Sequence, residues 1–312
     1  MKVGILVNPK HARTMRAYGH LIELLSRRRV PYRSATTTPH WPGAQQTTGL
    51  LDWGADLMVV LGGDGTLRAC ATTLAGKEVP VLIIPAGTAN VLSRHIGIRS
   101  SAHALHLVKA YLSGQAGGIR DVPVNEADCL TADGSRREHF LSLAGIGGDA
   151  RTIDRRTRLP GLLGRNILGY ACGAAAALFA ELFTVEITEA NDPPTADAPT
   201  QVWSVMASKT ARPAGPIPVF DRAEPTTGEF EFLAVALTST TFGDRLGEWA
   251  QIARDCVHRR PAANPAMRYW AGTGASIRLD APEPVQLDGD LIGDCRRLDL
   301  RTGTRSLTLL GP

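Results

Sequence analysis

The sequence has 312 residues, of which 44% are hydrophobic and 21% are charged. This balance is typical of a folded globular chain and excludes a disordered one. At ~150 residues per domain, the length suggests two domains. With 34 Lys and Arg against 30 Asp and Glu, the net charge of +4 is too small to indicate binding through bulk charge, so no nucleic-acid partner is expected.

Cysteine usage and apolar patterning indicate the compartment. The 5 cysteines include no CxxC pair, so we expect neither a zinc site nor a disulfide framework, and a reducing environment instead. The N-terminal apolar run is too short for a signal peptide, and the longest apolar stretch, residues 166–180, is shorter than the ~20 residues of a bilayer span. The sequence therefore predicts a cytoplasmic protein.

Over residues 1–120, buried apolar runs alternate with amphipathic stretches, as in repeated βα units. Such units imply an α/β fold with a doubly wound parallel sheet, whose ligands bind outside the carboxyl ends of the strands. The predicted strands lie at 3–7, 30–35, 56–61 and 79–84, and the predicted helices at 15–25, 43–53, from Thr66 onward, after Asn90, and at 102–112.

Beyond Asp121 the pattern changes to strands in hairpin-like succession, which predicts an antiparallel β-rich domain over 121–302. The final strand, within 303–312, is compatible with a return to the first domain. The predicted strands lie at 140–144, 184–188, 202–207, 229–237, 275–279 and 296–300, and the predicted helices near 165–182 and 245–257.

The most informative motif is Gly62-Gly63-Asp64-Gly65-Thr66, where a predicted strand ends and a helix begins. Glycines let backbone approach a polyphosphate, and a helix N-terminus offers N–H donors and a positive dipole end. A carboxylate repels phosphate unless a cation lies between them, so Asp64 indicates Mg²⁺, held directly or through water. A glycine-rich turn in which Asp64 caps the helix is the structural alternative. The sequence has no GxxxxGK[ST] loop and no GxGxxG fingerprint.

Two further turns follow predicted parallel strands. Pro85-Ala86-Gly87-Thr88-Ala89-Asn90 offers small hydrogen-bonding side chains, and Asn8-Pro9-Lys10 is followed by Arg13, so that two cations can neutralise phosphate charge. Because the carboxyl ends of parallel strands meet at one sheet edge, the three turns together predict a nucleotide-phosphate site.

These motifs, together with Gly145–Ala150 and the late Leu287-Asp288-Gly289-Asp290, resemble the diacylglycerol kinase catalytic-domain superfamily. That group includes bacterial diacylglycerol and other lipid kinases, sphingosine and ceramide kinases and, more distantly, NAD kinases. Asn90 followed by Val-Leu-Ser-Arg is similar to the lipid-kinase branch. The resemblance implies ATP as co-substrate with magnesium, an ATP-binding first domain, a β-sandwich-like second domain, and an active site in the cleft between them.

The resemblance also implies roles for single residues. Asp290 would accept the proton of the acceptor hydroxyl, with Asp288 beside it. Two residues apart on an extended strand, these carboxylates would face one side and suit a general base or a metal site; an exposed hairpin tip is the alternative. The implied nucleotide contacts are Asn8, Pro9, Lys10, His11, Ala12, Thr38, Gly62, Gly63, Asp64, Gly65, Thr66, Leu67, Arg68, Thr88 and Asn90.

The chain departs from the family pattern at three places. His11-Ala12 stands where the family has Ser-Gly, Asp290 where it has Glu, and Thr227 where it has an Asp on a structural magnesium ion. We therefore expect removal of divalent ions to stop activity without lowering thermal stability.

Two function classes remain open. The first is an ATP-dependent lipid kinase acting on a diacylglycerol-like or sphingoid-like hydroxyl. The second is a nucleotide- or lipid-binding regulatory protein without turnover, which the three departures motivate; an NAD kinase is a further alternative.

Two kinds of association are also compatible with the sequence. A basic segment around 159–163 is equally compatible with peripheral contact with anionic lipid at the inner membrane face and with a solvated helix face whose leucines lie in the core. Pairing of edge strands would give a homodimer. The arginines of the basic segment are Arg151, Arg155, Arg156, Arg158 and Arg165.

Overall fold

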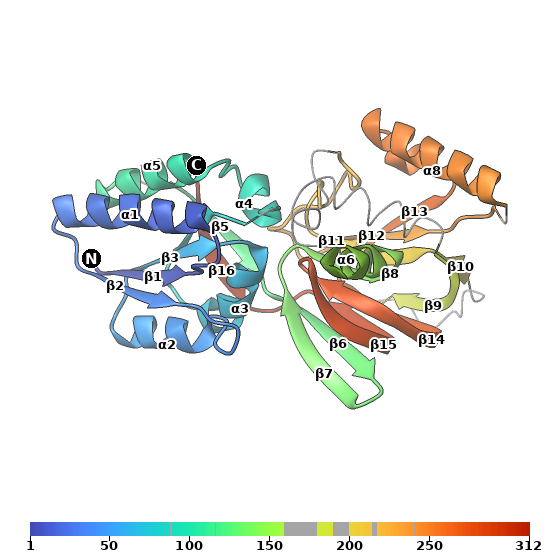
Figure 1. Cartoon of the computed structure of the whole chain (residues 1–312), viewed down its shortest axis with the longest axis horizontal. Helices are drawn as coiled ribbons and strands as arrows, with labels where there is room; N and C mark the ends of the chain where they lie inside the picture. The colour runs from blue at the N-terminus through green and yellow to red at the C-terminus, as the bar shows by residue number, and fades with distance from the viewer. Residues whose placement is uncertain (88, 116, 159–179, 190–199, 214–216, 240) are drawn as a thin grey trace. The chain divides into compact units, whose positions relative to one another are not determined.

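The computed structural model describes residues 1–87, 89–115, 117–158, 180–189, 200–213, 217–239 and 241–312 (Figure 1). The chain divides into two compact units. The first unit comprises Met1–Val124 and Gly303–Pro312, and the second comprises Asn125–Thr302. The expected boundary at residue 120 lies inside strand β5 (Gly118–Pro123), and the contacts place the division after that strand.

The first unit is built on a six-stranded sheet in the order β2-β1-β3-β4-β16-β5. Four strands pair in parallel: β1 (Val3–Val7), β2 (Tyr32–Thr36), β3 (Leu57–Gly62) and β4 (Val81–Pro85). Every residue of β1, β3 and β4 is buried, because helices cover both faces of the sheet. The helices are α1 (Ala12–Arg27), α2 (Ala44–Asp52), α3 (Asp64–Leu74), α4 (Val91–His95) and α5 (Ser101–Leu112).

Figure 1 shows α1 and α5 on one face of this sheet and α2 and α3 on the other. The predicted doubly wound parallel sheet is therefore confirmed. The terminal strand β16 (Ser306–Gly311) returns to this sheet, where it pairs in parallel with β4 and antiparallel with β5. The predicted start of a helix at Thr66 is wrong, since α3 begins at Asp64 with Gly63 as its N-cap.

The second unit is an antiparallel sheet in the order β13-β12-β11-β8-β14-β15-β6-β7, with β9 pairing to β10 and β14. This confirms the predicted β-rich second domain. Its strands are β6 (Asn125–Thr131), β7 (Gly134–Phe140), β8 (Leu143–Gly147), β9 (Phe183–Glu189), β10 (Thr200–Val202), β11 (Ser204–Ser208), β12 (Phe230–Val235), β13 (Met267–Gly272), β14 (Gly274–Leu287) and β15 (Asp290–Arg301). Its helices are α6 (Gly148–Arg158), α8 (Phe242–Val257) and the short η1 (Pro261–Ala263).

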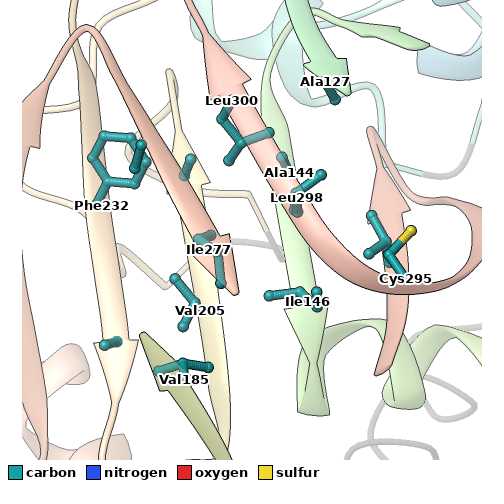
Figure 2. Close-up of a cluster of buried hydrophobic side chains, with 14 of the residues drawn as sticks. Ala127, Ala144, Ile146, Val185, Val205, Phe232, Ile277, Cys295, Leu298 and Leu300 are labelled. Atoms are coloured by element: carbon teal, nitrogen blue, oxygen red, sulfur yellow. The ribbon is translucent and has the colours of Figure 1, made fainter. Parts of the chain in front are cut away.

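One apolar core joins most of these strands. Figure 2 shows Ile146 of β8, Val205 of β11 and Ile277 of β14 among the side chains that meet there. Strand β14 contributes to this core from both of its ends, with Ala275 and Ile277 in the part that pairs with β9 and Val285 and Leu287 in the part that pairs with β8. The shift between the two halves accompanies an irregularity between Arg278 and Glu283.

Some sequence expectations concern residues outside the described ranges. Most of the predicted helix near 165–182 lies there, as do Cys172, Arg165 and the leucine-bearing stretch 159–163. The other four cysteines, Cys70, Cys129, Cys256 and Cys295, are buried and free. Of the helices in the described ranges, none combines the length and apolar character required to cross a membrane.

Candidate functional site

The three predicted phosphate turns follow adjacent strands at one edge of the first sheet. Their strands, β1, β3 and β4, are consecutive in the sheet order. The Asn8 amide nitrogen Nδ2 donates to Thr66 Oγ1 at 3.0 Å, and the Asn8 N–H donates to the Leu61 carbonyl at 2.9 Å. The Ala86 N–H donates to the Gly62 carbonyl at 2.9 Å. Each turn is therefore hydrogen-bonded to its neighbour, which fixes the backbone that a phosphate would meet.

Close backbone packing accounts for part of the glycine requirement at this edge. A Cβ added to Gly87 would lie 2.6 Å from the Cα of Gly63 and 2.9 Å from Asn90 Oδ1. A Cβ on Gly62 would lie 2.5 Å from Thr66 Oγ1. The turns after β3 and β4 thus touch through glycine backbone, in addition to any approach of a ligand.

Replacement of Gly87 by alanine is expected to weaken ATP binding about tenfold or more. Because the new methyl group would meet the rigid backbone of Gly63, both turns must shift, at a cost of ~1–3 kcal/mol. Titration calorimetry with ATP measures the change. Gly19→Ala is the control, since Gly19 lies in α1 with no heavy atom within 4 Å of the added Cβ. Equal ATP affinity of Gly87→Ala and wild type would contradict the packing role.

Asn90 shapes its own turn. Its backbone is left-handed (φ 48°), its Oδ1 accepts from the Gly87 N–H at 2.9 Å, and its Nδ2 donates to the Gly87 carbonyl at 2.8 Å. Asp64, the first residue of α3, accepts from the Leu92 N–H at 3.4 Å. Asp64 therefore links the first turn of α3 to α4. Thr88, another predicted nucleotide contact, lies outside the described residues.

The other predicted nucleotide contacts differ in their surroundings. Lys10 and Pro9 are exposed, and the Lys10 N–H donates to Asn8 Oδ1 at 3.1 Å. His11 is the N-cap of α1 and Ala12 is its first residue, so this helix also directs its N-terminus to the sheet edge. Thr38 accepts from the Trp41 N–H through its hydroxyl, which closes a local turn. Gly65 and Arg68 lie in the first half of α3, whereas the side chain of Leu67 is buried in the core.

A magnesium ion fits the donor set at Asp64. Mg²⁺ is commonly held by one or two carboxylates together with substrate phosphates and water. Within the described part of the chain, no cluster of three or more His, Cys, Asp or Glu side chains forms a self-contained metal site. Asp64 would therefore share the ion with the nucleotide.

The late acidic motif forms a tight turn rather than an extended strand. Strand β14 ends at Leu287, β15 begins at Asp290, and these two residues are paired. Between them, Asp288 (φ 51°) and Gly289 (φ 89°) are both left-handed, as a two-residue hairpin of the Asp-Gly type requires. The prediction that Asp288 and Asp290 share one side of a strand is wrong. The hairpin tip, held as the alternative, is the observed geometry.

Asp288 anchors the hairpin to a neighbouring segment. Its Oδ2 accepts from the Leu141 N–H at 2.8 Å. Its Oδ1 accepts from the N–H and hydroxyl of Ser142 at 2.8 and 2.7 Å and from the Leu143 N–H at 3.0 Å. These four hydrogen bonds give the Asp288 carboxylate a structural role. The exposed Asp290 therefore remains as the candidate reacting group of this motif.

The Gly145–Ala150 motif spans the end of β8 and the start of α6. A Cβ on Gly147 or Gly148 would overlap the rings of Phe183 or Trp203, so packing requires these glycines. The half-buried Asp149 accepts from Gln286 Nε2 at 2.7 Å, and desolvation of its carboxyl raises the pKa of Asp149 to about 6.

Asp149→Asn is expected to make stability less dependent on pH. Because the raised pKa of Asp149 means that the folded chain binds this proton more tightly, the protonated carboxyl stabilises the fold fully below about pH 4, and this contribution is lost as pH rises through about 6. The free energy of unfolding of the variant relative to wild type should therefore rise between pH 4 and pH 8, by up to ~3 kcal/mol. Urea unfolding across this range measures it. A difference that does not vary with pH would refute the assignment.

A buried lysine occupies the segment where the resemblance implies a structural metal. The Lys209 side chain is fully buried, and its Nζ donates to the Thr227 carbonyl at 2.8 Å and to Thr302 Oγ1 at 3.3 Å. Nζ also lies 4.4 Å from the centroid of the Phe230 ring, and burial lowers the pKa of Lys209 to about 8. With Thr227 in place of a carboxylate and an ammonium against its carbonyl, these residues do not fit a structural Mg²⁺.

Chelation is accordingly expected to separate stability from activity. EDTA should leave the melting temperature unchanged, because the positive charge of this segment is covalently part of the chain. Phosphoryl transfer should stop, because an ion shared by Asp64 and the nucleotide would be exchangeable. Differential scanning fluorimetry and a transfer assay, each with EDTA and with excess Mg²⁺, test both halves. A melting temperature that falls with EDTA and recovers with Mg²⁺ would contradict the expectation that stability does not depend on a bound ion.

The predicted basic segment is only partly described. Arg151 forms an ion pair with Glu283 and donates to the Glu181 carbonyl at 2.8 Å, so its guanidinium stabilises contacts within the second unit. Arg155 is exposed. The side chains of Arg156 and Arg158 lie outside the described residues.

Comparison with known proteins first establishes the class of fold. A solved structure of a diacylglycerol kinase from Bacillus anthracis aligns with 100% of this chain and 97% of its own, with a TM-score of 0.66 and 19% identity. The same two-domain α/β and antiparallel β fold is therefore present in both proteins.

The sequence comparison adds a family match for the first unit. Residues 2–120 match the model of the diacylglycerol kinase catalytic domain. An uncharacterized protein of Synechocystis sp. is 25% identical over 267 residues, which are 83% of this chain and 55% of that protein. An NAD kinase of Geobacter metallireducens is 36% identical over 93 residues, which are 30% of this chain and 33% of that enzyme. The aligned segments thus span about half of the first relative and a third of the second.

Proposed function

We propose that the protein is an ATP-dependent lipid kinase that transfers the γ-phosphoryl group to a hydroxyl of a diacylglycerol-like or sphingoid-like lipid. The observation that carries the proposal is the set of three hydrogen-bonded turns after β1, β3 and β4, which contain the matched catalytic-domain motifs. Glycine backbone and two helix N-termini at one edge suit a polyphosphate. Magnesium shared by Asp64 and the phosphates would neutralise charge that develops during transfer.

The chemical step requires one proton acceptor. The lipid hydroxyl oxygen forms a bond to the γ-phosphorus while the bond between that phosphorus and the β–γ bridging oxygen breaks, which releases ADP. The hydroxyl proton passes to the carboxylate of Asp290. Because an alcohol is barely acidic, this proton leaves late in the transfer, and positioning and charge neutralisation supply most of the rate.

The proposal is tested with γ-labelled ATP, Mg²⁺ and an extracted lipid pool. Label in the organic phase, followed by identification of the phosphorylated lipid by mass spectrometry, is the expected result. ATP binding without any labelled product would refute the kinase and favour a nucleotide-binding regulatory protein, the alternative that the departures at 11–12 and 290 motivate.

An NAD kinase is the second candidate function. The 36% identity to the Geobacter enzyme over 93 residues favours it. The same assay with NAD as acceptor discriminates between the two, since label in NADP with none in lipid would establish the NAD kinase.

A further inference from the structure

The turn that carries Asp290 is held from inside the second unit by a buried glutamine. Gln286 Oε1 accepts from the Gly289 N–H at 2.8 Å, directly before Asp290. The side chain of Gln286 is fully buried, at 0% exposure. The space next to its Cα is open, since a Cβ added to Gly289 would meet no heavy atom within 4 Å. The amide of Gln286 thus holds the Gly289 N–H from the buried side of the turn, in addition to the Leu287–Asp290 pairing that closes the hairpin.

The orientation of that amide is imposed by Asp149. Gln286 Nε2 donates to Asp149 Oδ2 at 2.7 Å, and an ionised carboxylate can only accept, so the amide nitrogen must face α6 and the oxygen must face Gly289. Asp149 is fixed in turn, because its N–H donates to Ser204 Oγ at 3.3 Å and that hydroxyl donates to the Ile146 carbonyl at 2.8 Å. The Arg151–Glu283 ion pair ties α6 to β14 again.

We propose that Gln286, oriented by Asp149, is a positioning residue that holds the Asp288-Gly289 turn so that Asp290 keeps the geometry needed for proton acceptance. The inference rests on the proposed function. Asp288 ties the first residue of the turn to 141–143, and Gln286 ties the second residue to α6. The hydrogen bonds of Asp288 and of Gln286 therefore hold both residues of the turn, and the turn directly precedes Asp290 at the start of β15. A misplacement of ~1 Å can cost ~100-fold in rate, so loss of one anchor should reduce turnover.

The test compares two buried side-chain amides, each of which donates to a carboxylate and accepts from a backbone N–H. Gln286→Met keeps the length of the side chain and removes both hydrogen bonds. Asn264 is its match, because Asn264 Nδ2 donates to Asp255 Oδ2 at 2.8 Å and its Oδ1 accepts from the Ala266 N–H at 3.0 Å, in a different part of the second unit. Asn264→Leu therefore removes an equivalent pair of bonds without touching the turn.

Two readouts are measured on the full-length protein. Hydrogen exchange of the peptide that contains Gly289 should accelerate at least tenfold in Gln286→Met and remain unchanged in Asn264→Leu. In the transfer assay, kcat should fall at least tenfold in Gln286→Met while KM for ATP changes less than twofold; Asn264→Leu should keep kcat within twofold of wild type, even with a similar loss of melting temperature.

The outcomes separate the two ideas. An active wild type whose kcat is unchanged in Gln286→Met, or lost equally in Asn264→Leu, overturns the positioning role alone. A wild type that transfers no phosphate to lipid refutes the proposed function. The exchange measurement then still decides whether Gln286 holds the turn, and unchanged exchange at Gly289 overturns that contact as well.

Discussion

Asp290→Asn is expected to reduce phosphoryl transfer at least ~100-fold while the affinity for ATP stays the same. Asparagine keeps the shape of the side chain but cannot accept the hydroxyl proton. The predicted ATP contacts all belong to the first unit, whereas Asp290 opens β15 in the second. Initial rates with γ-labelled ATP and calorimetric titration with ATP measure the two quantities.

Two further variants make this result specific. Asp290→Glu restores the residue that the resemblance places here and should retain transfer. Asp294→Asn removes another exposed carboxylate from β15 and should behave as wild type. Near-wild-type turnover by Asp290→Asn would show that a different group accepts the proton.

Asp288→Ala is expected to lower the free energy of unfolding by about 3–5 kcal/mol. The substitution removes the acceptor of three backbone N–H groups in the 141–143 segment and replaces a residue at φ 51° with one that tolerates this conformation poorly. Asp288→Asn should cost less, because asparagine accepts the left-handed backbone and keeps one acceptor oxygen. Urea unfolding of the three proteins measures the series.

An exposed carboxylate elsewhere on β14 provides the control. Asp280→Ala should change the free energy of unfolding by less than ~0.5 kcal/mol. If Asp288→Ala were as stable as wild type but inactive, the carboxylate would be a reacting group, and the anchoring role would be refuted.

The first sheet could be predicted closely because its signal is local. Strands β1, β3 and β4 are buried on both faces and therefore appear as unbroken apolar runs that end in glycine or proline turns. The start of α3 was mispredicted for a tertiary reason. Threonine is a good N-cap, but the hydroxyl of Thr66 instead accepts from Asn8, 58 residues earlier in the sequence.

The late motif contained two conflicting signals. Alternate spacing of Asp288 and Asp290 suggested one strand face, whereas the Asp-Gly step between them is a strong hairpin signal. The hairpin prevails, because the following strand β15 pairs with β14 from Leu287 onward. The short predicted strand at 275–279 has a similar cause, since Pro282 and Pro284 interrupt a pattern that the structure continues to Leu287.

Gln286 and Lys209 had no detectable sequence signal. Gln286 meets Asp149 across 137 residues, and a lone polar residue in a strand is usually on its solvent face. Lys209 likewise meets Thr302 across 93 residues, and lysine is among the residues least often buried. Such contacts depend on tertiary geometry, which spacing within a sequence does not encode.

The return of β16 has a consequence for biosynthesis. This strand lies between β4 and β5, so during translation the first sheet lacks a strand until residues 303–312 have left the ribosome. Domains generally fold in order from the N-terminus, but here the second unit can complete its contacts before the first. The first unit would therefore be completed after the second, once residues 303–312 have been synthesised.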